Sequence, residues 1–438
     1  MHNQKLKIYP IIIFVFLCAI GMTVFANDWP GWRGLDQDGT SEETGLIENW
    51  SLEGENLLWK EDFIGRSTPV VLNDRVYVIG RIGKEITQQE RITCFDAKTG
   101  NQLWNHQINV FHTTITFNRV GWTSPVGDVE TGNIYVHGIQ GLFICFSKDG
   151  DIVWSRSLTE EYGRISGYGG RVHTPIIAGN LVVVSFLNTA WGDQSIPRHR
   201  YYAFDKRSGE LIWVSTPGGR PLDTTYSTPV VTSVNGQMMI IGGNADGSIY
   251  AMKQATGEMV WGFKLSKRGI NTSVIVDGTK VYATHSEENF DTTAMGRVVC
   301  IDATGTGDVT STHEVWRADD IRVGYASPTI KDGQLYVVDN SANMYCLNAE
   351  TGEKLWEHSI GTVGKGSPVW ADGKLYVTEV NGKFHIFRPG KEKCESLSMQ
   401  EINRVDDDHY VEIFGSPAIA AGRIYFTTEE HLYCIGRK

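Results

Sequence analysis

Eight short phrases of the type Ser/Thr-Pro-hydrophobic recur along the chain, and the residues just before or at their start could bind a ligand. These residues are cationic, aromatic or amide side chains: Arg66, Trp122, Arg171, His173, Tyr226, Asn271, Tyr325, Lys365 and Phe414. Aromatic faces stack on the CH groups of sugars, while Arg and Lys bind carboxylate or sulfate. If the fold gathers the eight starts, they predict a site for an anionic or carbohydrate-like ligand. The alternative is that they only fill a wet channel.

Two long loops near the second and third of these units carry further polar side chains. The first loop is Glu160–Arg171, and the second is Asn188–Arg200, which contains Trp191, Asp193, Arg198 and His199. Binding residues lie on loops more often than on strands, so these loops are expected to set specificity. His173 and Asp193 could form an acid–base pair, but a histidine near a strand start more often has a structural hydrogen bond. No catalytic residue is assigned.

Two acidic stretches could suggest a metal site. Asp406–His409 combines three aspartates with a histidine, and Asp36–Glu43 contains four carboxylates. An exposed acidic loop explains the first better, and the second lacks the spacing of the twelve-residue calcium loop. No metal ligand is assigned.

A second pattern shows which elements would carry the candidate residues. In Met344–Trp356 (MYCLNAETGEKLW), a strand, a Thr-Gly turn and a strand ending in tryptophan follow one another. Glycine in the turn permits the positive φ that a tight return needs. Together with the opening phrase and an alternating strand, each unit holds four short strands and repeats about every 40–60 residues. This pattern predicts an all-β propeller of four-stranded antiparallel blades, with the opening residues around the mouth of its central channel.

The number of blades follows from the openings and from one orphan strand. The seventh unit lacks the Thr-Gly and tryptophan phrase and ends in the charged stretch Lys391–Met399, and the eighth stops after its third strand. Leu57–Lys60 (LLWK) resembles a last strand without its own unit, so it is expected to complete the eighth blade and remove the open edges. Eight blades are predicted, with seven as the alternative if the seventh unit forms no blade.

The repeated tryptophans are expected to be structural. They are Trp59, Trp104, Trp154, Trp213, Trp261, Trp316 and Trp356. A buried indole covers a large apolar area and needs one acceptor for its N–H, which a backbone carbonyl of the next blade can supply. Five cysteines occupy one equivalent strand position and are expected to be small buried residues rather than disulfides.

The N-terminus resembles a targeting segment. Lys5 and Lys7 precede the apolar run Ile11–Ile20, and Val24-Phe25-Ala26 resembles a cleavage site. We expect a signal peptide at 1–26, a strap at 27–54 and the propeller at 55–438. The protein would be periplasmic or secreted, with no transmembrane span after cleavage. A formal charge of −11 gives no support for nucleic-acid binding.

The repeated Asp-Ala-x-Thr-Gly-x-x-x-Trp phrase, with DWPGWRG and GLIENW near the start, resembles the PQQ-like β-propeller repeat family. This family of tryptophan-docking, quinoprotein-type propellers includes dehydrogenases dependent on pyrroloquinoline quinone (PQQ) and the outer-membrane assembly factor BamB. The resemblance specifies fold more than function. PQQ alcohol dehydrogenases carry a vicinal disulfide, and some carry a haem-attachment CxxCH. This chain has neither adjacent cysteines nor CxxCH.

The resemblance leaves two functions open. The favoured one is a non-catalytic, monomeric binding or scaffolding module for an envelope protein or a polysaccharide, with no cofactor. The alternative is a PQQ-dependent dehydrogenase of alcohols or sugars, with PQQ and calcium in a divergent site.

Overall fold

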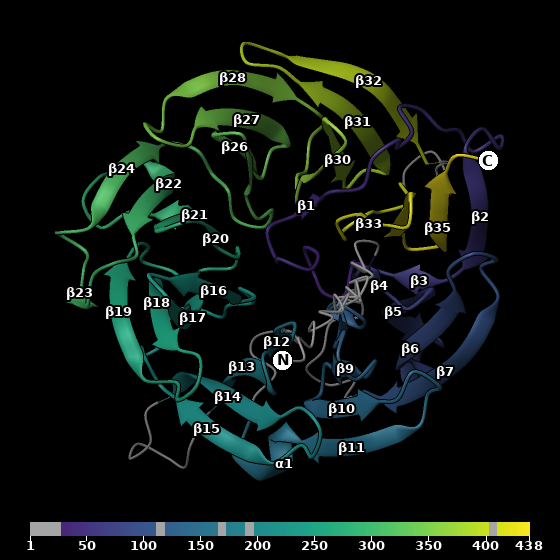
Figure 1. Cartoon of the computed structure of the whole chain (residues 1–438), viewed down its shortest axis with the longest axis horizontal. Helices are drawn as coiled ribbons and strands as arrows, with labels where there is room; N and C mark the ends of the chain where they lie inside the picture. Colours follow the sequence, from purple (N-terminus) through teal and green to yellow (C-terminus); the bar gives the residue numbers. More distant parts are fainter. Residues whose placement is uncertain (1–27, 111–118, 165–171, 189–196, 403–409) are drawn as a thin grey trace, which may run out of the picture.

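Eight β-sheets form a closed ring around a central channel (Figure 1). The computed structural model describes residues 28–110, 119–164, 172–188, 197–402 and 410–438. The expected signal peptide at 1–26 lies outside these residues. The prediction of an eight-bladed propeller of four-stranded antiparallel blades is confirmed.

Each blade runs from a short strand at the channel to a strand at the rim. In this order the strands of blades one to four are β4 (Val70–Leu72), β5 (Arg75–Ile82), β6 (Gln89–Asp96) and β7 (Gln102–Asn109); β8 (Val126–Gly127), β9 (Ile134–His137), β10 (Leu142–Phe146) and β11 (Ile152–Ser157); β12 (Ile176–Ala178), β13 (Leu181–Asn188), β14 (Arg198–Asp205) and β15 (Leu211–Ser215); and β16 (Val230–Val234), β17 (Gln237–Gly243), β18 (Ser248–Lys253) and β19 (Met259–Lys264). Those of blades five to eight are β20 (Ile275–Asp277), β21 (Lys280–Glu288), β22 (Met295–Asp302) and β24 (Glu314–Asp319); β25 (Thr329–Lys331), β26 (Gln334–Val338), β27 (Asn343–Asn348) and β28 (Lys354–Ser359); β29 (Val369–Ala371), β30 (Lys374–Glu379), β31 (Lys383–Pro389) and β32 (Cys394–Glu401); and β33 (Ala418–Ala420), β34 (Arg423–Thr427), β35 (His431–Gly436) and β2 (Leu57–Asp62). Additional short elements are β1 (Thr40–Ser41), β3 (Ile64–Gly65), η1 (Glu85–Thr87), α1 (Leu158–Tyr162) and β23 (Gly307–Asp308).

The ring closes through β2, which pairs antiparallel with β35 and places Trp59 opposite Cys434. This confirms that the N-terminal strand completes the last blade. The seventh unit also forms a full blade, because the charged stretch after β31 continues as β32 and pairs with it from Lys383 to Pro389. The seven-blade alternative is therefore wrong. An outermost strand needs only one buried face, so it can form without the tryptophan phrase.

A repeated tryptophan contact joins each blade to the next. The indole N–H donates to a backbone carbonyl in the neighbouring blade's turn at 2.9–3.2 Å: Trp59 to Ala97, Trp104 to Lys148, Trp154 to Lys206, Trp213 to Gln254, Trp261 to Ala303, Trp316 to Ala349 and Trp356 to Gly390. A β-bulge precedes each indole in the pairing with the third strand, as at Cys346/Leu347 opposite Trp356. Bulges of this kind re-aim a side chain.

The turn glycine of the next blade makes room for the indole. At Gly352, which has φ +76°, a Cβ atom would lie 2.4 Å from the ring of Trp316. The phrase thus needs glycine for its backbone angle and for this close approach. The described cysteines have free thiols, and all except the half-buried Cys394 are buried.

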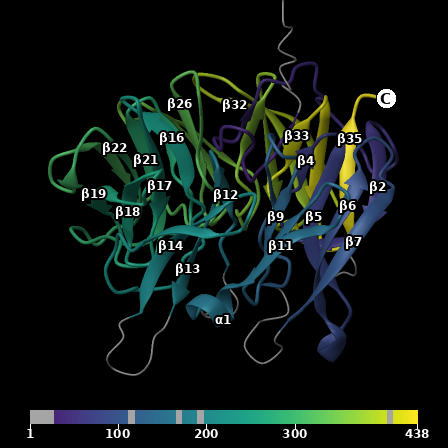
Figure 2. The same ribbon diagram turned by 60° about the horizontal axis from the view of Figure 1, so that its bottom comes forward.

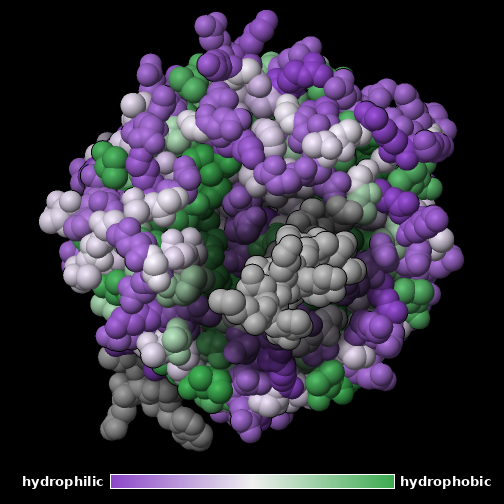
Figure 3. Space-filling view, viewed as in Figure 1, coloured by the Kyte–Doolittle hydropathy of each residue, from purple (hydrophilic) through white to green (hydrophobic). Residues whose placement is uncertain are grey.

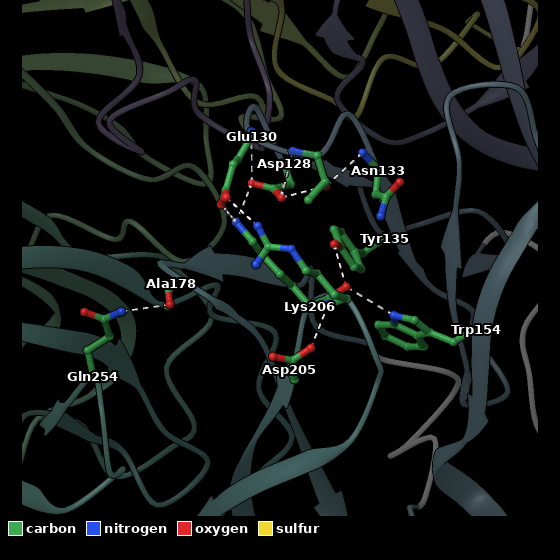
Figure 4. Close-up of polar contacts among 11 residues, drawn as sticks. Asp128, Glu130, Asn133, Tyr135, Trp154, Ala178, Asp205, Lys206 and Gln254 are labelled. Atoms are coloured by element: carbon green, nitrogen blue, oxygen red, sulfur yellow. Dashed lines mark hydrogen bonds and ion pairs between the residues drawn. The ribbon is translucent and has the colours of Figure 1, made fainter.

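A buried ion pair reinforces the seam between blades two and three (Figure 4). The Lys206 ammonium lies 3.0 Å from Asp128 and 2.7 Å from Glu130, and the Lys206 and Asp128 side chains are each 2% exposed. The backbone carbonyl of Lys206 accepts hydrogen bonds from Tyr135 and Trp154. One turn residue therefore joins the blades through both its side chain and its backbone.

Hydroxyl groups form a second set of links close to the channel. In six junctions the backbone N–H of the opening-phrase Ser or Thr donates to the Ser or Thr hydroxyl of the next blade at 2.9–3.2 Å: Thr68 to Ser124, Ser124 to Thr174, Ser273 to Ser327, Ser327 to Ser367, Ser367 to Ser416 and Ser416 to Thr68. We call these residues the hydroxyl ring. This ring explains why the opening phrase has Ser or Thr at this position. The residue donates through its backbone N–H and accepts through its hydroxyl oxygen.

The segment before β2 closes one end of the channel. Its strand β1 pairs in parallel with β29, and Trp29 forms a bridge with Val71. The buried Arg33 donates to the carbonyls of Asp38, Ser327 and Pro328 and to the hydroxyl of Thr329. Figure 2 shows this segment at the edge of the ring opposite α1. We call this end of the channel the strap end.

The face at the strap end is mainly hydrophilic, and its hydrophobic residues form small separate groups (Figure 3). Among the residues that the structure describes, no helix has both the length and the apolar character needed to cross a membrane.

Candidate functional site at the channel mouth

In each blade the residue three positions before the proline of the opening phrase, or before Val274 in blade five, lines the channel and lies at the end opposite the strap. From blade one to blade eight, these residues are Arg66, Trp122, Val172, Tyr226, Asn271, Tyr325, Lys365 and Phe414, and all eight line one cavity. The even-numbered blades therefore contribute aromatic rings, and the odd-numbered blades contribute cations, an amide and one valine. We call this set the channel mouth.

The four aromatic rings lie close enough to form a collar. The ring centroids of Trp122 and Phe414 are 5.9 Å apart, those of Trp122 and Tyr226 are 6.0 Å apart, and those of Tyr226 and Tyr325 are 6.4 Å apart. These spacings are typical of favourable aromatic pairs. Because each pair skips one blade, the rings reach toward the channel axis and narrow it.

Arg66 lies beside the aromatic collar, and only part of the hydrogen-bonding capacity of its guanidinium is used. Its Nη2 atom lies 2.6 Å from Glu412 and also contacts Glu429, and its guanidinium lies 3.9 Å over the ring of Phe414. Its Nε and Nη1 atoms are buried and have no hydrogen-bond partner. Burial lowers the pKa of Arg66 to about 10, so the group remains charged at neutral pH.

Lys365 supplies a second positive charge. Its Nζ atom lies 4.5 Å from the ring centroid of Phe414 and 5.3 Å from that of Tyr325. Burial, followed by repulsion from Arg66, lowers the pKa of Lys365. Within the described parts of the chain, its ammonium forms no ion pair.

The channel mouth encloses a small blind cavity. An inner volume of about 90 Å³ reaches Trp32 of the strap end and the hydroxyl ring, and a volume of about 200 Å³ adjoins it at the collar, lined also by Arg119 and Glu412. Asn271 borders the inner volume, and its Oδ1 atom is buried without a donor. The cavity thus combines aromatic faces with unmet donors and one unmet acceptor.

The structure brings together seven of the nine residues expected to bind a ligand, that is, all except Arg171 and His173. His173 does not join them, because it lies one position beyond Val172, and successive residues of an extended segment point to opposite sides. Its ring is buried and stacks on His199 at 4.9 Å. The channel position of blade three therefore belongs to Val172, and Arg171 lies outside the described residues.

Other expectations fall outside the described residues. These are the loop residues Trp191 and Asp193 and the acidic stretch Asp406–His409. The imagined pairing of His173 with Asp193 therefore has no described geometry. Burial lowers the pKa of His173 well below its usual value and that of His199 to about 4, so both rings are neutral.

Three contributors at the mouth were not identified from the sequence. Glu412 and Glu429 pair with Arg66 although they lie at the far end of the chain. Glu90 accepts the backbone N–H groups of Gly121 and Ile139 at 3.1 and 2.8 Å and so fixes the loop that carries Trp122. Burial raises the pKa of Glu90 to about 7. None of the three lies in an opening phrase, so the repeat contains no signal for them.

The tryptophan seams, the eight blades and the closing strand define a quinoprotein-type β-propeller. The sequence matches the family described as "Outer membrane protein assembly factor BamB" over residues 88–321 and again over 245–438, and the chain belongs to this family.

Individual relatives agree with this placement. Outer membrane protein assembly factor BamB of Moranella endobia (strain PCIT) is 23% identical over 310 residues, which cover 69% of this chain and 59% of that protein. The factor of the same name from Burkholderia pseudomallei (strain K96243) is 24% identical over 239 residues, covering 54% of this chain and 52% of that protein. The chain thus spans between about half and three fifths of the curated relatives it matches.

Solved structures share the fold at low identity. BamB from Moraxella catarrhalis has a TM-score of 0.61 at 14% identity and covers 87% of this chain and 99% of its own. A europium-containing methanol dehydrogenase has a TM-score of 0.69 at 12% identity, with 94% and 98% covered. The quinohemoprotein alcohol dehydrogenase of Comamonas testosteroni has a TM-score of 0.65 at 12% identity, with 94% and 80% covered. These likenesses show the fold alone.

The residues at the channel mouth do not fit a calcium-bound quinone. Calcium takes six to eight oxygen ligands, mostly carboxylates. No cluster of three or more His, Cys, Asp or Glu residues in the described part of the chain could hold a metal ion. Glu412, the carboxylate that lines the collar, is bound to Arg66. The described residues at the mouth therefore do not supply the donor set needed to orient such a cofactor.

Proposed function

We propose that this chain is an exported, non-catalytic β-propeller that acts as a binding or scaffolding module for an envelope protein. Membership of the BamB family supports the class of partner, since the relatives are named for outer-membrane protein assembly. The apolar run and cleavage pattern at 1–26 support export to the periplasm or beyond.

One observation carries the non-catalytic part of the proposal: the described carboxylates and histidines nearest the cavity are already engaged or buried. General acid–base catalysis needs a group within reach of the substrate and able to exchange a proton. Glu412 and Glu429 are tied to Arg66, and His173 and His199 are buried and neutral. The channel mouth is better suited to holding a ligand than to transforming it.

The ring architecture supports a scaffolding role. In five of the eight junctions the described residues form both a tryptophan seam at the rim and a link of the hydroxyl ring near the channel. Binding to a rigid surface requires little ordering of the protein and so retains more of the contact energy.

A deletion strain of the source organism tests the choice of partner. Loss of the protein is expected to lower the amount of folded outer-membrane proteins, and the full chain is expected to restore it. A chain without residues 1–26 serves as the matched control and is expected not to restore it. Unchanged outer-membrane protein levels in the deletion strain would overturn an envelope-protein partner.

An activity assay tests the non-catalytic part. The purified chain is incubated with PQQ, Ca²⁺ and an electron-accepting dye, together with alcohols and sugars. We expect no turnover above the protein-free blank. Turnover would instead support the dehydrogenase alternative.

A further inference from the structure

The channel mouth leaves buried polar groups of two blades without partners, although it is otherwise well packed. The Arg66 side chain is 3% exposed, yet its Nε and Nη1 atoms have no acceptor. Asn271 Oδ1 is buried without a donor. Buried groups of this kind are normally paired, and an unpaired one costs about 1–3 kcal/mol. A ligand with both acceptors and donors would satisfy them together.

The positive charge at the channel mouth favours the binding of an anion. Among the described residues, three cations, Arg66, Arg119 and Lys365, line the collar together with one carboxylate, Glu412, and Arg66 is also paired with Glu429. The chain as a whole has a formal charge of −11, so the mouth is a positive region on a negative protein. Low-dielectric walls focus such a field and attract ions of opposite sign.

The size and lining of the cavity restrict the anion further. Its two adjoining volumes, about 90 and 200 Å³, are each smaller than the roughly 300–1,000 Å³ of sites that enclose a whole small molecule. It therefore suits one end group of a longer chain. Aromatic faces from Trp122, Tyr226 and Tyr325 favour a group with apolar CH faces.

We propose that the channel mouth binds a single anionic sugar residue, such as a uronate, at the end of an envelope polysaccharide. The carboxylate pairs with Arg66 and Lys365, a ring hydroxyl donates to Asn271 Oδ1, and the CH face of the sugar lies against the aromatic collar. An acidic peptide offers the carboxylate, but it has no ring hydroxyl for Asn271. This inference goes beyond the proposed function, because it requires no protein partner.

Titration calorimetry with the full protein tests the proposal. The probes are sodium glucuronate, neutral glucose, acetate and an N-acetylated, aspartate-terminated peptide. Glucuronate is expected to bind saturably and to quench tryptophan fluorescence, while glucose and acetate bind at least about tenfold more weakly, as expected when a charge-assisted hydrogen bond or a ring contact is missing. Equal affinity for glucose or for acetate would overturn the proposal. Tighter binding of the peptide would overturn it in favour of an acidic protein segment.

A pair of lysine variants locates the binding. Lys365→Gln is expected to weaken glucuronate binding at least about tenfold. Lys331→Gln is the matched control: Lys331 also lies 4.5 Å over an aromatic ring, that of Trp370, but at the strap end and paired with Glu42 at 3.0 Å. Near-UV circular dichroism checks that both variants remain folded. An equal loss of affinity in both variants, or no loss in Lys365→Gln, would contradict a site at the mouth.

Discussion

The two ends of the channel use the same residue types in opposite ways. Arg33 at the strap end and Arg66 at the mouth are 2% and 5% exposed. Arg33 donates to three backbone carbonyls and a hydroxyl, whereas two nitrogen atoms of Arg66 have no acceptor. Burial lowers the pKa of each to about 10. The two arginines are thus similarly buried but differ in their hydrogen bonds. Arg33 is a structural residue, whereas Arg66 has nitrogen atoms that are available to a ligand.

Two lysines repeat the contrast. Lys331 and Lys365 each lie over aromatic rings, but only Lys331 also has a carboxylate partner. Lys331 is thus paired at the strap end, whereas Lys365 has no carboxylate partner among the described residues at the mouth. This difference supports our proposal that a ligand binds at the mouth.

The contrast between the two ends of the channel assumes that the blades between them form a rigid ring. Replacing a tryptophan at a junction between blades should weaken this ring most strongly. Trp261 is fully buried and donates to Ala303 across the seam. Trp261→Ala should lower the free energy of unfolding by about 3–5 kcal/mol, because it leaves a cavity and removes a hydrogen bond. Urea unfolding measures the loss. A midpoint equal to that of the wild type would show that the seam does not hold the ring.

The ion pair near the strap end offers a test of similar size. Lys206→Met removes the partner of Asp128, whose side chain is 2% exposed. A buried charge without its partner typically costs about 3–5 kcal/mol. Thermal unfolding should show this loss at neutral pH. The control Lys253→Met removes an exposed pair with Glu258 and should change stability by less than about 1 kcal/mol.

The contrast between the two arginines can be tested directly. Arg33→Met should cost about 3 kcal/mol, because it leaves buried backbone carbonyls without donors. Arg66→Met should cost less than about 1 kcal/mol, since Glu412 and Glu429 are partly exposed and can be hydrated. Guanidinium unfolding of both variants provides the comparison. Equal losses would remove the distinction between a structural end and a ligand-binding end.

A further expected effect is a loss of stability in acid. The pKa of His199 is lowered to about 4 in the folded protein, against about 6.5 when unfolded, so the unfolded state binds more protons below pH 6.5. Stability from this group is full above pH 6.5 and falls as the pH drops toward 4. The melting temperature between pH 8 and 4 should show this, and His199→Gln should flatten the curve. Because the pKa of Glu90 is raised, its contribution to stability changes with pH in the opposite direction. The informative quantity is therefore the difference in melting temperature between the wild type and His199→Gln.

Much of the fold was predictable because repeated phrases report local structure. The Thr-Gly turn and the tryptophan determined the outer hairpins, and the orphan strand with Trp59 predicted the closure. The outer strand of blade seven, Cys394–Glu401, lacks that phrase, although it pairs with β31 and packs Cys394 and Leu397 against the core. Because these side chains differ from those of the other outer strands, the repeat motif does not mark this strand.

The site was predictable only in part, because its chemistry depends on contacts between blades. The positions of Arg66, Trp122 and Lys365 followed from the opening phrases. His173 lies one residue beyond the channel position, where blades one, two, four and five have Ser or Thr and blades six to eight have Ala or Gly. The pairing of Arg66 with Glu429 joins the first and last blades, and no local pattern contains that information.

The closing strand also constrains the order in which the protein can fold. Synthesis releases β2 early and its partner β35 last, so β2 must stay unpaired while the intervening blades form. Bringing such distant segments together carries a large loop-closure entropy and is slow. The pairing of β2 with β35 is therefore expected late in folding, and until it forms, β35 of blade eight and β2 itself each present an unpaired edge to which a chaperone or a second chain can attach.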